Sequence, residues 1–476
     1  MAEPPLPTPP PGTGAAASRT VLGRGLLYTV GTAAPVLANA VVTPFVTRLL
    51  GSEEYGIVAT ALVVIQVGMI LAGLGLGAAI TRHGILERSG AAGARFLVRR
   101  GAVTAVGVTA VGALLAAPLA RVAGIDDEVA VVLALVSAAG FSMVVNAQAY
   151  LRVADRPLPF VLLSMGAALG GPVLGVVLLL VVPDAGDRAY LAGLAAGFVV
   201  TGLAGLALTA RHPHHERGDT RRALRVGLPT IPHQVAIYLA SGVLVLVAGH
   251  LFGAADAGRL QLAVLIGSAP GVLTSSLNNA WAPVVYRADQ GHRGAVLERT
   301  GRDIMALTAL TAGGVALLAP LLLRIVAPPS YDPAALTPGV GLAAIGSVLS
   351  VLYLANVHLV FASGRSEGLA VVTPTALLVG TLFAWGAGTA LGLTAVASGM
   401  AVTYAAMTFG VALLARRVSP VRWSERMLAA PLAVGVALCL VGAFLPVGGG
   451  WSIARAGTAA ALVVLAGAAM RRILTR

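Results

Sequence analysis

The chain has 476 residues, of which 57% are hydrophobic and 11% charged, and its mean hydropathy is +0.89. Soluble domains are about one-quarter charged, so this composition excludes an ordinary soluble protein and is typical of a protein that lies in a bilayer. All 32 basic residues are arginine, and the absence of lysine excludes a Walker A phosphate loop, a Schiff base and a lysine general base. The net charge of +13 does not indicate nucleic-acid binding, because the arginines lie in short loops and form no basic domain.

The N-terminal residues 1–18 contain six prolines and lack both a basic and an apolar region of the kind found in signal peptides. We expect a disordered tail, with the first apolar helix acting as the insertion signal. Cys439 is the single cysteine, so the chain can form neither an internal disulfide nor a cysteine metal cluster.

About fourteen apolar segments follow, each able to cross a hydrocarbon core of roughly 30 Å as a helix. No connection between them is long enough to fold by itself. The expected fold is therefore an all-α polytopic membrane protein, divided into a tail (1–18), an N-terminal lobe with helices 1–6 (19–215), a C-terminal lobe with helices 7–12 (216–418) and helices 13–14 (419–476). The segments span residues 26–49, 56–80, 101–120, 129–151, 158–182, 189–210, 227–250, 260–285, 304–326, 338–362, 369–390, 392–415, 428–447 and 454–471.

The loop arginines predict the orientation. With both termini in the cytoplasm, 26 arginines fall on the cytoplasmic side and six on the outer side. Short cytoplasmic loops carry an excess of arginine, so we expect a multi-pass protein of the cytoplasmic membrane with both termini inside. The alternation of arginine-rich and arginine-poor loops along the chain also supports an even number of spans.

An internal repeat links the two halves. Residues 48–56, between the first two segments, resemble residues 250–258, between the seventh and eighth. Since six spans separate the copies, the two halves have the same orientation and are parallel repeats, as in several transporter folds. An offset of 202 residues aligns Gly51 with Gly253 and Gly56 with Gly258.

Neutral polar residues inside the apolar segments are the candidate cargo ligands. Nearly all carboxylates lie in loops or at helix ends, so none is available near the bilayer centre for ion coupling. Hydrogen bonding between helices also explains each neutral residue taken singly. Prolines interrupt the first helix of each half, at Pro35 and Pro44 and at Pro229 and Pro232, which indicates either a transport site or packing kinks. The candidates are Asn39, Gln66, Asn146, His233, Gln234, Asn278, Asn279 and Trp281.

Arginine suits a cargo that carries pyrophosphate, because its guanidinium stays charged and binds phosphate oxygens in pairs. Arg24 and Arg82 stand at cytoplasmic helix ends and Arg48 at an outer end, although topology alone also explains them. The histidines at 212, 214 and 215 read as a solvated loop. We therefore expect no metal and no cofactor.

Residues 47–56, followed by a helix that ends at Arg82, resemble the opening of the Wzx-type polysaccharide flippases of the multidrug/oligosaccharidyl-lipid/polysaccharide exporter superfamily. Residues 280–287 resemble the eighth helix of that family. The resemblance implies two six-helix lobes that form a V around a central cavity, with two extra C-terminal helices. Helices 1, 2, 7 and 8 would line the cavity.

The expected function is the transport, without covalent chemistry, of polyprenyl-pyrophosphate-linked oligosaccharide for cell-surface polysaccharide synthesis. Expected partners are this lipid-linked glycan, the membrane lipids, and a polymerase or glycosyltransferases of the same pathway, with no nucleic acid. A multidrug or other small-molecule exporter of the same fold stays an alternative. A membrane glycosyltransferase or polymerase is the alternative from another class, although the chain shows neither the large outer loop nor the carboxylate pair usual for such enzymes.

Overall fold

The computed structural model describes residue 38 and residues 41–87, 89–125, 127–209 and 219–474. Within these ranges the chain is helical and contains no strand, and 13 helices are long and apolar enough to cross a membrane. This confirms the polytopic all-α fold. Residues 41–49 are the helical end of the first predicted segment, and the rest of that segment lies outside the described residues, with Arg24, Pro35 and Asn39. The histidine-rich loop at 212–215 also lies outside them.

The first lobe contains the helices up to residue 208. A π-helical turn, η1 (Gly166–Gly170), joins two of them into one span. The helices are α2 (Ser52–Gly73), α3 (Leu76–Leu86), α4 (Gly90–Leu114), α5 (Ala116–Ala123), α6 (Glu128–Val153), α7 (Pro157–Met165), α8 (Gly171–Val181) and α9 (Gly186–Leu208).

The second predicted segment, 56–80, is not one helix. It divides into α2 and α3 at Leu74 and Gly75, whose φ angles of 48° and 66° are left-handed. Gly75 is required here both by this φ and by space, because a Cβ would overlap the carbonyl oxygen of Gly227. The break therefore lies against the chain that leads into the second lobe.

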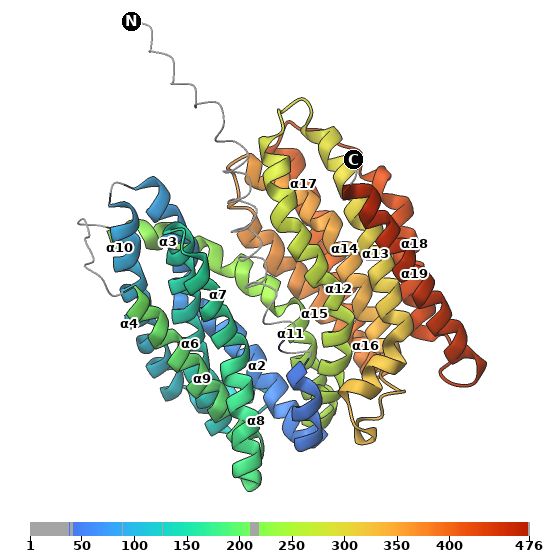
Figure 1. Ribbon diagram of the computed structural model, residues 1–476, viewed down its shortest axis with the longest axis horizontal. Coiled ribbons are helices and arrows are strands. Elements are labelled where there is room, and N and C mark those ends of the chain that lie inside the picture. Colours follow the sequence, from blue (N-terminus) through green and yellow to red (C-terminus); the bar gives the residue numbers. More distant parts are fainter. Residues whose placement is uncertain (1–37, 39–40, 88, 126, 210–218, 475–476) are drawn as a thin grey trace, which may run out of the picture.

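The second half of the chain begins with a short amphipathic helix that packs against α3 of the first lobe, and two further helices follow the second lobe at the C-terminus (Figure 1). The second proline pair lies where the 3-10 turn η3 (Leu228–Thr230) interrupts the helical run Asp219–Phe252, with Pro229 in the turn and Pro232 in the first turn of the helix that follows. The helices are α10 (Asp219–Gly227), α11 (Ile231–Phe252), α12 (Ala254–Arg287), α13 (Arg293–Val326), α14 (Thr337–Ala362), α15 (Leu369–Leu391), α16 (Leu393–Val396), α17 (Ser398–Val418), α18 (Ala429–Phe444) and α19 (Gly450–Leu474).

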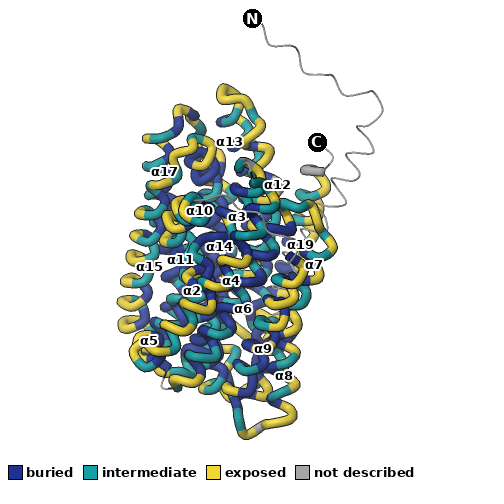
Figure 2. Tube along the Cα trace, turned by 90° about the vertical axis from the view of Figure 1, so that its left-hand side faces the viewer, coloured by how far each residue is buried: buried dark blue, intermediate teal, exposed yellow. Residues whose placement is uncertain are grey.

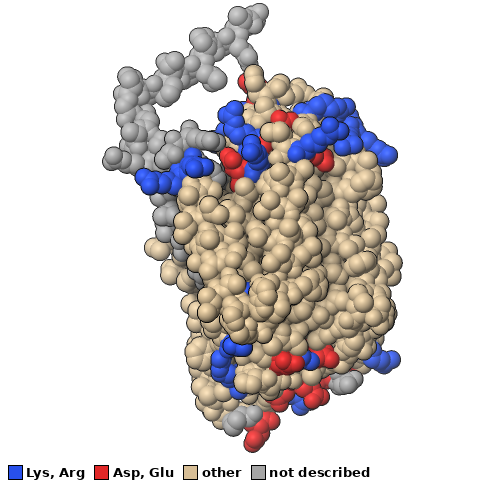
Figure 3. Space-filling model, turned by 90° about the vertical axis from the view of Figure 1, so that its right-hand side faces the viewer, with Lys and Arg blue, Asp and Glu red and all other residues tan. Residues whose placement is uncertain are grey.

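The two lobes form a V (Figure 1). They are splayed apart at the end where α10 and the last turns of α19 lie and meet at the opposite end, where α2 packs against α11 and α12. Buried positions follow the inner faces of the helices, whereas the outward faces are largely exposed (Figure 2). A broad band on the surface carries almost no charge, and arginines crowd the upper end in this view, which is the end at which the V is open (Figure 3). This band is the expected lipid-facing belt.

The repeated glycines bring the lobes into contact at the closed end of the V. A Cβ on Gly56 would overlap the carbonyl oxygen of Ala254, and one on Gly258 would lie 2.7 Å from the carbonyl oxygen of Ser52. The starts of α2 and α12 thus pack backbone to backbone. The two copies of the repeat are therefore in direct contact with each other.

Three side chains add hydrogen bonds between the lobes at this closed end, and we call these bonds the latch. They join the end of the helical stretch 41–49 and the residue after it to the end of α13 and the segment that follows α13. Thr47 Oγ1 donates to the carbonyl oxygen of Val326 (2.5 Å), Arg48 Nη2 to that of Ile325 (2.9 Å) and Tyr331 Oη to that of Leu50 (3.2 Å).

Arg455 fixes the last two helices to the second lobe. Its side chain is buried, and its guanidinium donates to carbonyl oxygens at the end of α18 and to that of Leu317 in α13 (3.1 Å). The carbonyls that end a helix lack partners within it, so one arginine satisfies several of them at once.

Candidate functional site

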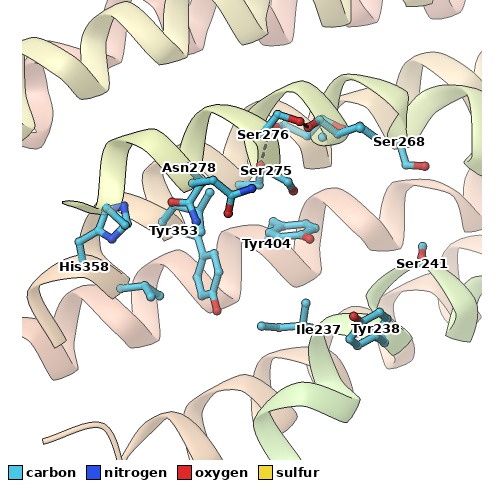
Figure 4. A pocket seen from close by; sticks show the side chains of 18 of the residues that line it. Ile237, Tyr238, Ser241, Ser268, Ser275, Ser276, Asn278, Tyr353, His358 and Tyr404 are labelled. Carbon is cyan, nitrogen blue, oxygen red and sulfur yellow. Dashed lines mark hydrogen bonds between the residues drawn. The ribbon is translucent and has the colours of Figure 1, made fainter. Parts of the chain in front are cut away.

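A cavity of about 650 Å³ opens on the face of the second lobe that is turned toward the first. Four helices of the second lobe, α11, α12, α14 and α17, form most of its wall, as the close view shows (Figure 4). Among the described residues, Gln66 of α2 is the one contribution from the first lobe. The site is therefore built mainly on one side of the V.

Helical spacing explains how one polar face arises on each wall. On α12, Ser268 and Ser275 lie seven residues apart and Ser275 and Asn278 three apart, so the three share a face. On α14, Ser350 and His358 lie along the cavity in the same way. The remaining faces of these helices are apolar and pack inside the lobe.

The described lining of the cavity is uncharged and combines polar side chains with apolar ones. It contains serines, tyrosines, amides and two histidines, and no arginine, aspartate or glutamate. Several serine hydroxyls donate within their own helices, for example Ser276 Oγ to the carbonyl oxygen of Val272 (2.9 Å) and Ser350 Oγ to that of Ser347 (2.7 Å). Their lone pairs remain as acceptors toward the cavity.

His358 is held by two aromatic rings. The ring of Trp281 meets it edge-on with centroids 4.8 Å apart, and the ring of Tyr286 does so at 5.6 Å. Tyr286 Oη lies 3.3 Å from His358 Nδ1, and Trp281 Nε1 donates to Thr300 Oγ1 (2.7 Å). Trp281 is buried and does not itself line the cavity. It therefore packs on the side of His358 that is turned away from the cavity and fixes the position of that ring.

Three polar atoms in the cavity wall are buried and have no hydrogen-bond partner among the described protein groups: Asn278 Oδ1, Tyr353 Oη and His358 Nε2. Tyr353 and His358 are only 4% and 2% exposed. Such groups are rare in folded proteins, because an unpaired buried polar atom costs about 1–3 kcal/mol. Their presence together at one cavity points to a hydrogen-bonding ligand.

The candidates predicted from the sequence divide into two groups. Gln66, His233, Asn278 and Asn279 line the cavity, and His233 Nδ1 lies 2.7 Å from Thr373 Oγ1. These four come from both halves of the chain.

The other described candidates lie elsewhere. Asn146 is buried within the first lobe, near Gly101, and Gln234 Nε2 donates to Thr230 Oγ1 (2.7 Å). Arg82 is exposed near the open end of the V and lies 3.4 Å from Glu87 Oε1. Arg48 belongs to the latch and Trp281 supports His358.

The sequence analysis did not single out the tyrosines and serines of the cavity. Tyr238, Tyr353 and Tyr404 project from three different helices toward the same space (Figure 4). The periodic serines of α12 were a usable signal, since Ser268 and Ser275 share a face with Asn278. The tyrosines gave no comparable signal because tyrosine is common in packed helices.

Comparison with known proteins supports the architecture. A family model described as polysaccharide biosynthesis protein matches residues 22–288. No curated protein matches the chain.

Solved transporters share the fold. The lipid II flippase MurJ, in an inward closed conformation, superposes with a TM-score of 0.71 at 10% identity over 95% of this chain and all of its own. A multidrug resistance MATE family transporter of the MOP superfamily, in an inward-facing conformation, gives 0.62 at 19% identity over 84% of this chain and 98% of its own. A mutant of the Vibrio cholerae MATE transporter VcmN gives a TM-score of 0.57 at 15% identity, and the match covers 85% of this chain and 97% of that transporter. At these identities the likeness establishes the fold.

The family match covers more than half of the chain, and the V of two lobes agrees with the folds of these transporters. The chain therefore belongs to the polysaccharide biosynthesis protein family and is a multi-pass membrane protein that shares its fold with these solved structures.

Proposed function

We propose that this protein is a flippase that moves polyprenyl-pyrophosphate-linked oligosaccharide from the inner to the outer leaflet of the cytoplasmic membrane. The proposal is supported by the family match and by the fold. A polymerase or glycosyltransferases of the same pathway would supply and use the cargo. No covalent bond of the cargo changes during the transfer.

The observation that carries the proposal is the character of the cavity. Its described wall offers many hydrogen-bond donors and acceptors and no charge, which suits sugar hydroxyl groups. Large cationic drugs would instead favour a carboxylate in the wall. The cavity faces the other lobe, where a path for cargo between the lobes is expected.

The arrangement of the lobes supports alternating access. We place the arginine-rich end in the cytoplasm, since basic loops stay on that side of the membrane. The V is then open to the cytoplasm and latched at the outer end. Cargo would enter the open end, and rocking of the lobes would break the latch and expose the cavity to the outside.

The membrane potential would help to drive export. Moving an anionic diphosphate from a negative interior to the outside is favoured by about 2.3 kcal/mol per charge per 100 mV. This requires no coupling carboxylate in the membrane. Arg82, and Arg24 outside the described residues, remain our candidates for meeting the diphosphate at the entrance.

Proteoliposomes that contain a fluorescent undecaprenyl-pyrophosphate oligosaccharide test the proposal. We expect protein-dependent movement between leaflets and slower movement with Asn278→Ala. Thr375→Ala is the matched control, because Thr375 is exposed on α15 and does not line the cavity. The absence of movement with several glycans, together with efflux of cationic dyes, would instead favour a drug exporter.

A further inference from the structure

We propose that the second-lobe wall of the cavity is a neutral oligosaccharide site, in which Asn278, Tyr353 and His358 bind sugar hydroxyl groups. This inference rests on the proposed function and adds which part of the cargo is recognised. The sugar end is bound, and the diphosphate and lipid remain outside this site.

The unpaired atoms support a ligand rich in hydroxyl groups. Asn278 Oδ1 only accepts a hydrogen bond, Tyr353 Oη both donates and accepts, and His358 Nε2 does either according to its tautomer. A hydroxyl group also donates and accepts, so the hydroxyl groups of an oligosaccharide can match each of these atoms. An inorganic anion could satisfy donors only and would leave the amide oxygen without a partner.

The aromatic side chains give the site a second property. Tyr353 and Tyr404 lie against each other at the cavity with ring centroids 6.1 Å apart and an interplanar angle of 71°. Their rings supply apolar faces beside polar edges, which suits a sugar ring with its apolar face and its polar rim. Figure 4 shows both tyrosines close to Asn278.

The absence of charge in the described wall favours the sugar part of the cargo over its phosphate part. An anionic group would be desolvated in this cavity without a compensating cation from its described wall, which is costly. A volume of about 650 Å³ lies within the range of ligand pockets and accommodates a short oligosaccharide. The second lobe therefore carries the glycan, and the first lobe contributes chiefly Gln66 among the described residues.

Binding to the purified full-length protein in detergent tests the site. The probes are the free oligosaccharide, released by mild acid from the lipid-linked glycan that the proteoliposomes transport, and inorganic pyrophosphate. We expect the oligosaccharide to bind and pyrophosphate not to displace it. Tyr353→Phe and Asn278→Ala should each weaken binding about two- to tenfold, as expected for the loss of one hydrogen bond.

Tyr190→Phe serves as the control, because Tyr190 is similarly buried but lies in α9 away from the cavity. It should bind as wild type does. Displacement by pyrophosphate, unchanged affinity in both site variants, or no oligosaccharide binding up to millimolar concentration would overturn the site while leaving the flippase function intact. If no lipid-linked glycan is transported at all, the proposed function itself fails.

Discussion

Weakening the latch should open the outer end of the protein. The double variant Thr47→Val with Tyr331→Phe removes two hydrogen bonds between the lobes and keeps the shape of both side chains. Both acceptor carbonyls belong to the opposite lobe. The bonds exist only while the outer end is closed, so their loss destabilises that state alone.

The magnitude follows from the two bonds. Each neutral hydrogen bond contributes about 0.5–1.5 kcal/mol, so the closed state should lose about 1–3 kcal/mol relative to the open one. That corresponds to a change of roughly five- to 150-fold in the ratio of the two states. Leu50 and Tyr331 are only 2% and 0% exposed. Removing the hydroxyl group of Tyr331 therefore leaves the carbonyl oxygen of Leu50 buried without this partner, which adds to the loss of stability of the closed state.

Distances between spin labels measure this ratio. Leu180 and Leu391 are exposed at the outer ends of the first and second lobe, and their cysteine variants can be labelled because Cys439 is buried. We expect the double variant to populate longer distances than wild type in liposomes.

The control for the latch experiment is Thr389→Val with Tyr190→Phe. It makes the same chemical changes, but Thr389 Oγ1 donates within its own helix (3.0 Å) and Tyr190 lies inside the first lobe. If the latch variant and this control give the same distance distribution, the bonds of Thr47 and Tyr331 do not hold the outer end closed.

Three further predictions concern stability and driving force. Partial burial alone would raise the pKa of Asp127, but hydrogen bonds from Arg188 (2.6 Å) and from the backbone N–H of Val129 lower it below its ordinary value. Because the folded-state pKa is the lower one, this contact stabilises the protein above the ordinary aspartate pKa of about 3.9 and is lost as pH falls through the lowered value. The melting temperature of wild type should therefore fall more steeply than that of Asp127→Asn in this acidic range, and parallel curves would contradict the assignment. Arg455→Met should cost at least about 2 kcal/mol by leaving buried carbonyls unpaired, whereas Arg324→Met, at an exposed site, should unfold like wild type. Finally, collapsing an inside-negative potential with an ionophore should slow glycan transport, and an unchanged rate would exclude the potential as a driving force.

The sequence predicted the spans well because bilayer thickness sets the length of each apolar run. The ends of the thirteen described spans agree with the predicted segments to within a few residues at most positions. The break at Leu74 was missed, since hydropathy does not depend on φ and the residues on both sides are apolar. The arginine count predicts an orientation that only a topology experiment can test.

The candidate site was predicted in part. Asn278 and His233 stand out in apolar helices because amides and imidazoles are uncommon there. Whether a polar side chain faces the partner lobe or its own lobe depends on helix packing, which is why Asn146 was chosen alongside them although it is buried within the first lobe. Tyr353 was not chosen, because its hydroxyl matters only through the cavity that packing creates.

The repeat shows that the two halves have diverged in their tasks. The offset of 202 residues places Gln66 of α2 opposite Ser268 of α12, and both line the cavity. The same offset sets the break at Leu74 and Gly75 opposite residues 276–277, where α12 runs on without interruption. One copy of this helix thus presents an unbroken polar face that can hold a ligand, and the other is broken where it packs against Gly227. Equivalent positions of the two halves thus carry two different features, a polar helix face in one half and a helix break in the other.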